Sequence, residues 1–253
     1  MSSGGSKAPH HSASRLLTWE DIQTLPATLA RDEILTVNAS GLSPEIHSTR
    51  PYEWRGISLV VPPGVFRPGP TARLIHDRLM DGLLPVSGKR YAAMGVGLGV
   101  EAVAAGMRGA GLVLGVDIHS RSVEVAQANF DFLVGTGAFR GVVSDLWENV
   151  EISEQLDVVT FNPPFIDTPL SSDPDLARNM CQGFRLAIRF FEQMRQKSVL
   201  ARGGVIYVVL SNTAPLRDFV GLAISSGYRV EALHEQGWQG ERVRTFLFAL
   251  HSR

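Results

Sequence analysis

Four consecutive residues near the middle of the chain, Asn162-Pro163-Pro164-Phe165, have the types and order best suited to chemistry. They follow the apolar run 156–161, which predicts a buried strand. Because proline cannot donate to a sheet ladder and fixes φ, the two prolines should end the strand and hold Asn162 in an extended conformation. The Asn162 amide oxygen and a backbone carbonyl can then accept both hydrogens of a planar –NH2 group, whose π-face Phe165 can cover. The arrangement suits methylation of an sp2 or amide nitrogen, and an ordinary Asn-Pro-Pro turn is the alternative.

A glycine-rich turn with Gly95, Gly97 and Gly99 separates a predicted strand, 90–94, from a predicted helix. Such a turn lets the backbone approach a ligand closely. The spacing is not the dinucleotide fingerprint G-x-G-x-x-G, because the third glycine comes one residue early, and no Gly-Lys-Ser/Thr follows for a phosphate loop. The turn is a weak signal by itself, since helix–strand packing turns in other α/β proteins look similar.

Acidic residues end the next two predicted strands. Asp117 stands where an acid can accept both hydroxyls of an adenosine ribose, and capping the following helix is its alternative role. Asp145 can accept from an exocyclic adenine amine while Leu146 or Trp147 flanks the ring, and a surface turn residue is the alternative. A glycine-rich turn, two acids and then Asn-Pro-Pro-Phe, in order on four strand ends, are more specific together than any one alone.

Strand-like runs alternate with helical segments from residue 89 onward. This alternation predicts an α/β fold with a Rossmann-like, doubly wound and mostly parallel sheet. The runs 229–234 and 244–251 have no helix between them and predict an antiparallel C-terminal hairpin edge. We expect three parts: a disordered tail over 1–14, an N-terminal extension over 15–70 with a helix and a short β-hairpin, and a catalytic domain over 71–253. The extension could close over a compact substrate, on Phe66 and Phe165.

Local signals give finer expectations for the first third of the chain. The segment from Thr18 to Asp21 resembles a capping box and predicts a short helix toward Ala30. Residues 52–61 predict two short strands around an Arg-Gly turn. Thr71 is expected to cap a helix that continues to about Leu83.

Composition narrows the class of protein. The 253 residues are 44% hydrophobic with a formal net charge of −1, so no overall basic field attracts nucleic acid or anionic lipid. The single cysteine, Cys181, excludes an internal disulfide and suits a reducing compartment. No signal peptide or membrane-length apolar stretch is visible, so a cytoplasmic protein without membrane contact is expected. The histidines lack ligand spacing, so we expect no metal site.

Together these motifs resemble the class I S-adenosylmethionine-dependent methyltransferases, and among them the HemK-type protein-glutamine N-methyltransferases with an Asn-Pro-Pro-Tyr/Phe motif. The resemblance runs from about Tyr52 to the C-terminus. It implies that Asn162 and Pro163 hold the acceptor nitrogen, with Phe165 beside them, as the catalytic residues. It also implies S-adenosyl-L-methionine as the cofactor, bound by Gly95, Gly97, Gly99, Asp117, Ile118, Asp145, Leu146 and Asn162.

The chain departs from the family pattern at three places. Ala93 stands where an acid usually precedes the glycine-rich turn. Val96 and Leu98 replace the usual Thr and Ser, and Pro70 replaces an acid in the segment before the first core helix. Glu101, just inside the first helix, is a candidate to contact the methionine amine instead, and a surface glutamate is the alternative.

The expected acceptor is a planar amide or amine of a protein, such as a Gln or Asn side chain, or of a small molecule. A nucleobase exocyclic amine in RNA or DNA is the alternative, against which the net charge of −1 counts. Arg185 and Arg189 could form a phosphate patch, although a solvated helix face fits the charge balance better. A methyltransferase-like binding subunit without turnover is a third hypothesis, motivated by Ala93.

Overall fold

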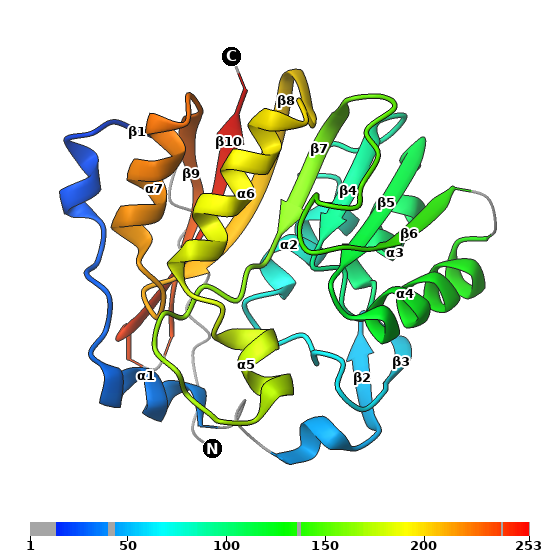
Figure 1. Ribbon diagram of the computed structural model, residues 1–253, viewed down its shortest axis with the longest axis horizontal. Helices are drawn as coiled ribbons and strands as arrows, with labels where there is room; N and C mark the ends of the chain where they lie inside the picture. The colour runs from blue at the N-terminus through cyan, green and yellow to red at the C-terminus, as the bar shows by residue number, and fades with distance from the viewer. Residues whose placement is uncertain (1–13, 40–43, 136–137, 239, 253) are drawn as a thin grey trace, which may run out of the picture.

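The computed structural model describes residues 14–39, 44–135, 138–238 and 240–252 (Figure 1). An eight-stranded sheet, in the order β1-β9-β10-β8-β7-β4-β5-β6, runs through the molecule, and a separate two-stranded sheet pairs β2 with β3. The strands are β1 (Arg15–Leu17), β2 (Arg50–Trp54), β3 (Ile57–Val61), β4 (Arg90–Met94), β5 (Leu112–Asp117), β6 (Phe139–Val143), β7 (Leu156–Phe161), β8 (Leu200–Ser211), β9 (Arg229–Trp238) and β10 (Val243–His251). The helices are α1 (Arg31–Asn38), α2 (Arg73–Met80), α3 (Val100–Met107), α4 (Ser120–Leu133), α5 (Pro174–Met180), α6 (Phe184–Gln196) and α7 (Leu216–Ser225), with 3-10 turns η1 (Asp21–Thr24) and η2 (Pro44–His47).

The centre of the large sheet is parallel, as the alternation of strands and helices predicted. Strands β6, β5, β4, β7 and β8 run in one direction, and β10 is antiparallel to both β8 and β9. The predicted C-terminal hairpin is therefore confirmed. It is not the outermost part of the sheet, however, because the short strand β1 pairs antiparallel with β9, with Leu16 opposite Glu231.

Helices cover both faces of the sheet (Figure 1). On one face, Phe190 of α6 and Phe219 of α7 pack on side chains such as Ile206 of β8. On the other face, α2, α3 and α4 and the β2/β3 hairpin enclose a second core that includes Tyr207. Successive residues of β8 point into the two cores in turn, which explains why the buried strands appear in the sequence as continuous apolar runs.

Two local expectations were wrong. The segment after Thr18 forms only the 3-10 turn η1, although the backbone N–H of Thr18 does donate to Asp21 Oδ2 at 2.8 Å. Leu25 is extended, with ψ of 149°, because it precedes a proline and that proline disfavours helix. Thr71 is not the cap of α2, because that helix begins after Ala72. The backbone carbonyl of Thr71 instead accepts a hydrogen bond from Leu74 N at 3.1 Å.

Helix α5, a short helix after β7, was not expected from the sequence. Asp173 caps it by accepting from the backbone N–H of Asp175 at 2.9 Å, and Pro174 occupies its first position. The imidazole of His47 lies 2.6 Å from Asp173 Oδ2 and 3.5 Å from Asp175 Oδ2, so it joins η2 to α5. The hydrogen bond with His47 lowers the pKa of the Asp173 carboxyl.

Of the expected tail over 1–14, only Ser14 lies among the described residues. Within the described part of the chain, no helix combines the length and the apolar composition that crossing a bilayer requires.

Candidate functional site

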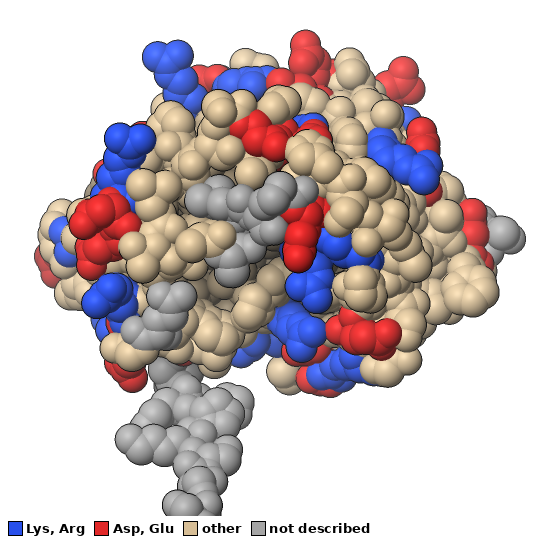
Figure 2. Space-filling view, turned by 90° about the horizontal axis from the view of Figure 1, so that it is seen from below, with Lys and Arg blue, Asp and Glu red and all other residues tan. Residues whose placement is uncertain are grey.

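A cavity of about 580 Å³ lies at the carboxyl ends of the parallel strands, where ligands of open α/β sheets bind. Figure 2 shows the molecule from this side. The cavity extends from the glycine-rich turn to the Asn-Pro-Pro segment. Each strand end singled out from the sequence therefore contributes to one site. Its lining comes from residues 37–38, 66–72, 94–98, 100–101, 117–118, 144–146, 161–166, 178–180, 209–211 and 213–214, with His76, Gln182, Leu186, Trp238 and Val243.

The three glycines of the turn have different roles. Gly95 and Gly97 line the cavity with φ of +67° and +51°, a left-handed conformation that favours glycine. A Cβ on Gly97 would have only the Gly95 carbonyl within 4 Å, at 3.8 Å, so this backbone faces open space where a ligand can approach. Gly99 lies outside the lining. A Cβ there would stand 2.7 Å from the Cα of Ala126, so Gly99 lets α3 pack closely on α4.

Asp117 ends β5 at the cavity wall and braces the turn. Its Oδ2 accepts from Gly97 N at 3.0 Å and its Oδ1 from His119 N at 2.9 Å. Burial raises the pKa of the Asp117 carboxyl, and the two backbone donors oppose that rise. The cap of α4 is His119 and not Asp117, so the alternative role predicted for Asp117 is not the observed one. Each carboxylate oxygen keeps a further lone pair for a hydroxyl on the cavity side.

Apolar side chains flank the acids along the same wall. Ile118 also lines the cavity and is 54% exposed, so it offers a free apolar surface beside Asp117. Leu146 lines the cavity as well and holds a left-handed φ of +54°. Trp147, in contrast, is fully buried with its ring 6.3 Å from that of Phe190, so of the two residues predicted to flank an adenine only Leu146 is placed to do so.

Asp145 lines the cavity from the end of β6. Its Oδ2 accepts from Arg189 on α6 at 2.7 Å. Arg189 is therefore not simply a solvated residue on its helix, as the sequence suggested, because it holds the carboxylate of a site residue. The second oxygen of Asp145 remains available to an amine donor.

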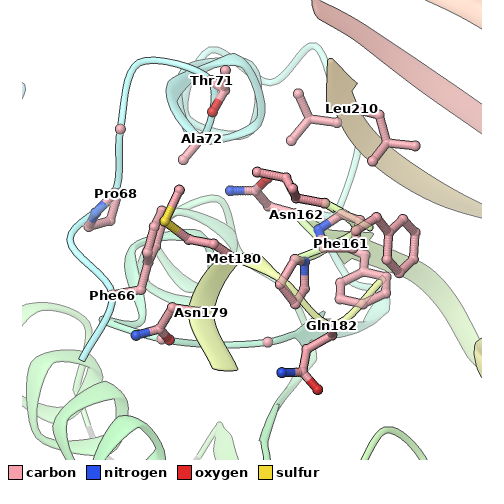
Figure 3. Close-up of a pocket in the computed structure, with 18 of the residues that line it drawn as sticks. Phe66, Pro68, Thr71, Ala72, Phe161, Asn162, Asn179, Met180, Gln182 and Leu210 are labelled. Atoms are coloured by element: carbon pink, nitrogen blue, oxygen red, sulfur yellow. The ribbon is translucent and has the colours of Figure 1, made fainter. Parts of the chain in front are cut away.

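The Asn-Pro-Pro turn follows β7, and Figure 3 shows Asn162 directed into the cavity toward Phe66 and Met180. The Pro163 carbonyl accepts from Phe165 N at 3.0 Å and keeps a second lone pair. Phe165 is 1% exposed, with its ring 5.6 Å from that of Phe161 in an edge-on arrangement. Its ring thus supports the turn from the core side.

The opposite wall of the acceptor end was only partly expected, because the sequence pointed to Phe66 but not to Met180 or Gln182. Phe66 comes from the loop before α2, and Met180 and Gln182 come from the end of α5 (Figure 3). The backbone N–H of Gln182 donates to the Pro164 carbonyl at 2.8 Å, which fixes this wall to the Asn-Pro-Pro turn. The Asp173-Pro174 pair was the signal for the helix that brings these residues here.

Sequence comparison then decides the family. The profile of the Methyltransferase small domain family matches residues 62–232. The chain belongs to this family. A Methanocaldococcus jannaschii protein named as a protein N5-glutamine methyltransferase is 29% identical over 185 residues, which cover 71% of this chain and 88% of the relative. The release factor glutamine methyltransferase of Koribacter versatilis is 29% identical over 140 residues, which cover 53% of this chain and 48% of the relative.

Solved structures confirm the fold of this methyltransferase. The 16S rRNA N2 G1207 methyltransferase of T. thermophilus, in complex with AdoMet and guanosine, superposes with a TM-score of 0.58 at 19% identity over 81% of this chain and 50% of that one. The E. cuniculi Mtq2–Trm112 complex, which methylates the termination factor eRF1, matches with a TM-score of 0.54 at 18% identity over 75% of this chain and 99% of that one. Both share the class I methyltransferase architecture.

The protein is therefore an S-adenosylmethionine-dependent methyltransferase, as its motifs predicted. The cavity fits that cofactor. Gly95 and Gly97 offer open backbone, Asp117 and Asp145 offer acceptors for hydroxyls and an amine, and Ile118 with Leu146 offers apolar surfaces for a planar base. When bound, the cofactor supplies an electrophilic methyl group on a positively charged sulfur, so the protein's own task is to position the acceptor.

Proposed function

We propose that this enzyme methylates the side-chain amide nitrogen of a glutamine or asparagine in a protein, with a small-molecule amide or amine as the other acceptor of the same chemistry. The observation that carries the proposal is the Asn162 side chain, which enters the cavity (Figure 3), while the adjacent Pro163 also lines it. Two of the relatives named above act on glutamine, which supports the same acceptor here.

The chemistry follows from two hydrogen bonds. An amide nitrogen is a weak nucleophile because its lone pair is delocalised into the carbonyl. If its N–H groups donate to Asn162 Oδ1 and to the Pro163 carbonyl, the nitrogen is held with its lone pair able to turn toward the methyl group. The same acceptors stabilise the positive charge that grows on nitrogen as the N–C bond forms and the S–C bond breaks. The sulfur keeps the bonding electrons, and an amide proton leaves to solvent.

The shape of the acceptor end favours a compact, neutral group. Phe66 and Met180 supply an apolar wall opposite Asn162, and Phe66 is placed to cover the π-face that we first assigned to Phe165. Val37 and Asn38 of α1 also line the cavity, so we propose that the extension over 15–70 forms part of the acceptor wall ahead of the catalytic domain over 71–253.

A nucleobase acceptor is the second candidate, because one solved neighbour modifies rRNA. The face that holds the cavity intersperses acidic and basic side chains with broad neutral areas (Figure 2), whereas polyanion binding usually needs a visibly basic surface. A binding subunit without turnover is the third hypothesis. Against it stands the intact Asn-Pro-Pro turn, whose residues line the cavity and whose Asn162 side chain is directed into it (Figure 3).

Substitution of Asn162 tests the proposal. Asn162→Ala should lower methyl transfer by about two to three orders of magnitude, since it deletes one preorganised acceptor, while affinity for S-adenosylhomocysteine stays within about threefold. A matched control is Gln155→Ala, which removes an exposed amide that donates to the Ser198 carbonyl. The assay uses labelled cofactor with translation release factors and cell extract, each with and without nuclease. Equal loss of affinity and turnover would make Asn162 a purely structural residue, and nuclease-sensitive label would select the nucleobase candidate.

A further inference from the structure

The end of β4 lacks the acid that usually precedes the glycine-rich turn. Ala93 and Met94 occupy this place, and both are buried and neutral. The cavity is nevertheless lined by a carboxylate on the other side of the turn, because Glu101 lies in the first turn of α3. Its side chain is 12% exposed, so it is not the surface glutamate that the sequence allowed as an alternative.

A buried polar chain holds this carboxylate in place. The hydroxyl of Thr160 donates to Glu101 Oε2 at 2.5 Å. Because that hydroxyl hydrogen is used, Tyr91 must donate its own to Thr160 Oγ1, over 2.6 Å. Burial, and then the nearby Glu101 carboxylate, raise the pKa of Tyr91, so the phenol stays a neutral donor. Such a chain fixes both the position and the rotamer of Glu101.

The carboxylate is short of positive charge. Among the described residues, its one ion-pair contact is with His76, whose Nε2 lies 3.6 Å from Glu101 Oε1. His76 is 3% exposed and also lines the cavity, and its Nδ1 has no hydrogen-bond partner in the described part of the chain. A largely buried carboxylate without a close cation is costly unless a ligand supplies one.

We propose that Glu101 receives the α-ammonium group of the methionine part of S-adenosylmethionine, in place of the acid missing at Ala93. The ammonium would lie at the end of the cavity between the glycine-rich turn and α2, where His76 lines the wall. Thr160 and Tyr91 are positioning residues in this account, since they act through Glu101. The proposal depends on the cofactor and not on the identity of the acceptor.

The test compares two ligands that differ by one amino group. S-adenosylhomocysteine carries the ammonium, and deamino-S-adenosylhomocysteine lacks it but is otherwise the same. Isothermal calorimetry on the full chain gives both affinities for the wild type, Glu101→Gln and a control, Glu124→Gln, which changes an exposed glutamate on α4. Glu101→Gln should weaken S-adenosylhomocysteine by roughly ten- to a hundredfold and leave the deamino ligand within about threefold. The control should change neither.

Two outcomes would overturn the proposal. Equal weakening of both ligands by Glu101→Gln would mean that Glu101 shapes the cavity without binding the amino group, and no weakening of either would mean that it binds nothing. Thr160→Val provides a second variant if Glu101→Gln does not fold. Without the hydroxyl the carboxylate is no longer fixed, so the preference for the amino-bearing ligand should fall by roughly three- to tenfold. An unchanged preference in Thr160→Val would also count against the proposal. Failure of Asn162→Ala to affect methyl transfer would leave these results untouched.

Discussion

Removal of the Asp117 carboxylate should separate cofactor binding from folding. Asp117→Ala deletes the acceptor of two backbone N–H groups, those of Gly97 and His119. An unpaired, partly buried N–H costs about 1–3 kcal/mol, but the substitution also removes a charge whose burial is unfavourable, as the raised pKa of Asp117 indicates. These effects oppose each other, so we expect the free energy of unfolding to fall by about 1–3 kcal/mol and the fold to persist.

Asp117→Ala should also weaken cofactor binding. If both ribose hydroxyls donate to Asp117, Asp117→Ala loses two hydrogen bonds to a charged acceptor, and affinity for S-adenosylhomocysteine should fall by about 1.5–3 kcal/mol, or roughly ten- to a hundredfold. The assay is calorimetry with S-adenosylhomocysteine and with its 2′,3′-dideoxy analogue. Glu124→Ala, an exposed residue paired with Arg121, serves as the control.

The dideoxy ligand isolates the ribose contacts. It cannot donate to Asp117, so the wild type and Asp117→Ala should bind it with affinities that differ by less than about threefold. An equal loss for both ligands would show that Asp117 matters only as a brace of the glycine-rich turn. Unchanged affinity of the variant for S-adenosylhomocysteine would refute the ribose assignment altogether.

Three further predictions follow from individual contacts. Gly99→Ala should lower the free energy of unfolding by about 1–3 kcal/mol in urea denaturation, because its φ is +85° and the new Cβ would meet a backbone atom of α4 at 2.7 Å; wild-type stability would contradict this. Asp157→Asn should lower the free energy of unfolding by about 1 kcal/mol at pH 7, since hydrogen bonds from Arg90 lower the pKa of Asp157. This difference should vanish as the pH falls below 3.8, the ordinary pKa of the carboxyl, and then through its lower pKa in the folded state. A difference that does not change with pH would count against this reasoning. Arg189→Ala should leave calorimetric affinity for S-adenosylhomocysteine within about threefold, because the exposed ion pair with Asp145 is weak, and a tenfold loss would give Arg189 a direct role in binding.

Elements bounded by strong local signals were predictable from the sequence. β4 and β7 have the predicted bounds, because each is a mostly apolar run that is followed by a glycine-rich or an Asn-Pro-Pro turn. The order of these strand ends also gave the shared site, since parallel strands bring their carboxyl ends to one edge of the sheet. Neither inference required knowledge of tertiary contacts.

Elements that depend on tertiary contacts were not predictable. β1 has only three residues and exists because β9 offers a free edge. The direction in which Phe165 and Trp147 point is decided by the aromatic core beneath them, and no periodicity in a turn reveals it. The role of Glu101 likewise depends on Thr160, which lies 59 residues away in the sequence and reaches it only in the folded chain.

The measurement that most directly tests the central claim is the chemical form of the transferred methyl group. The enzyme is incubated with trideuteromethyl-labelled cofactor and a protein acceptor, and the labelled protein is then hydrolysed in acid. A methyl group on a side-chain amide leaves as deuterated methylamine, because acid cleaves the amide bond. We expect this product from the wild type and its loss with Asn162→Ala. Label that resists hydrolysis on another amino acid, or that disappears with nuclease treatment, would contradict methylation of a side-chain amide.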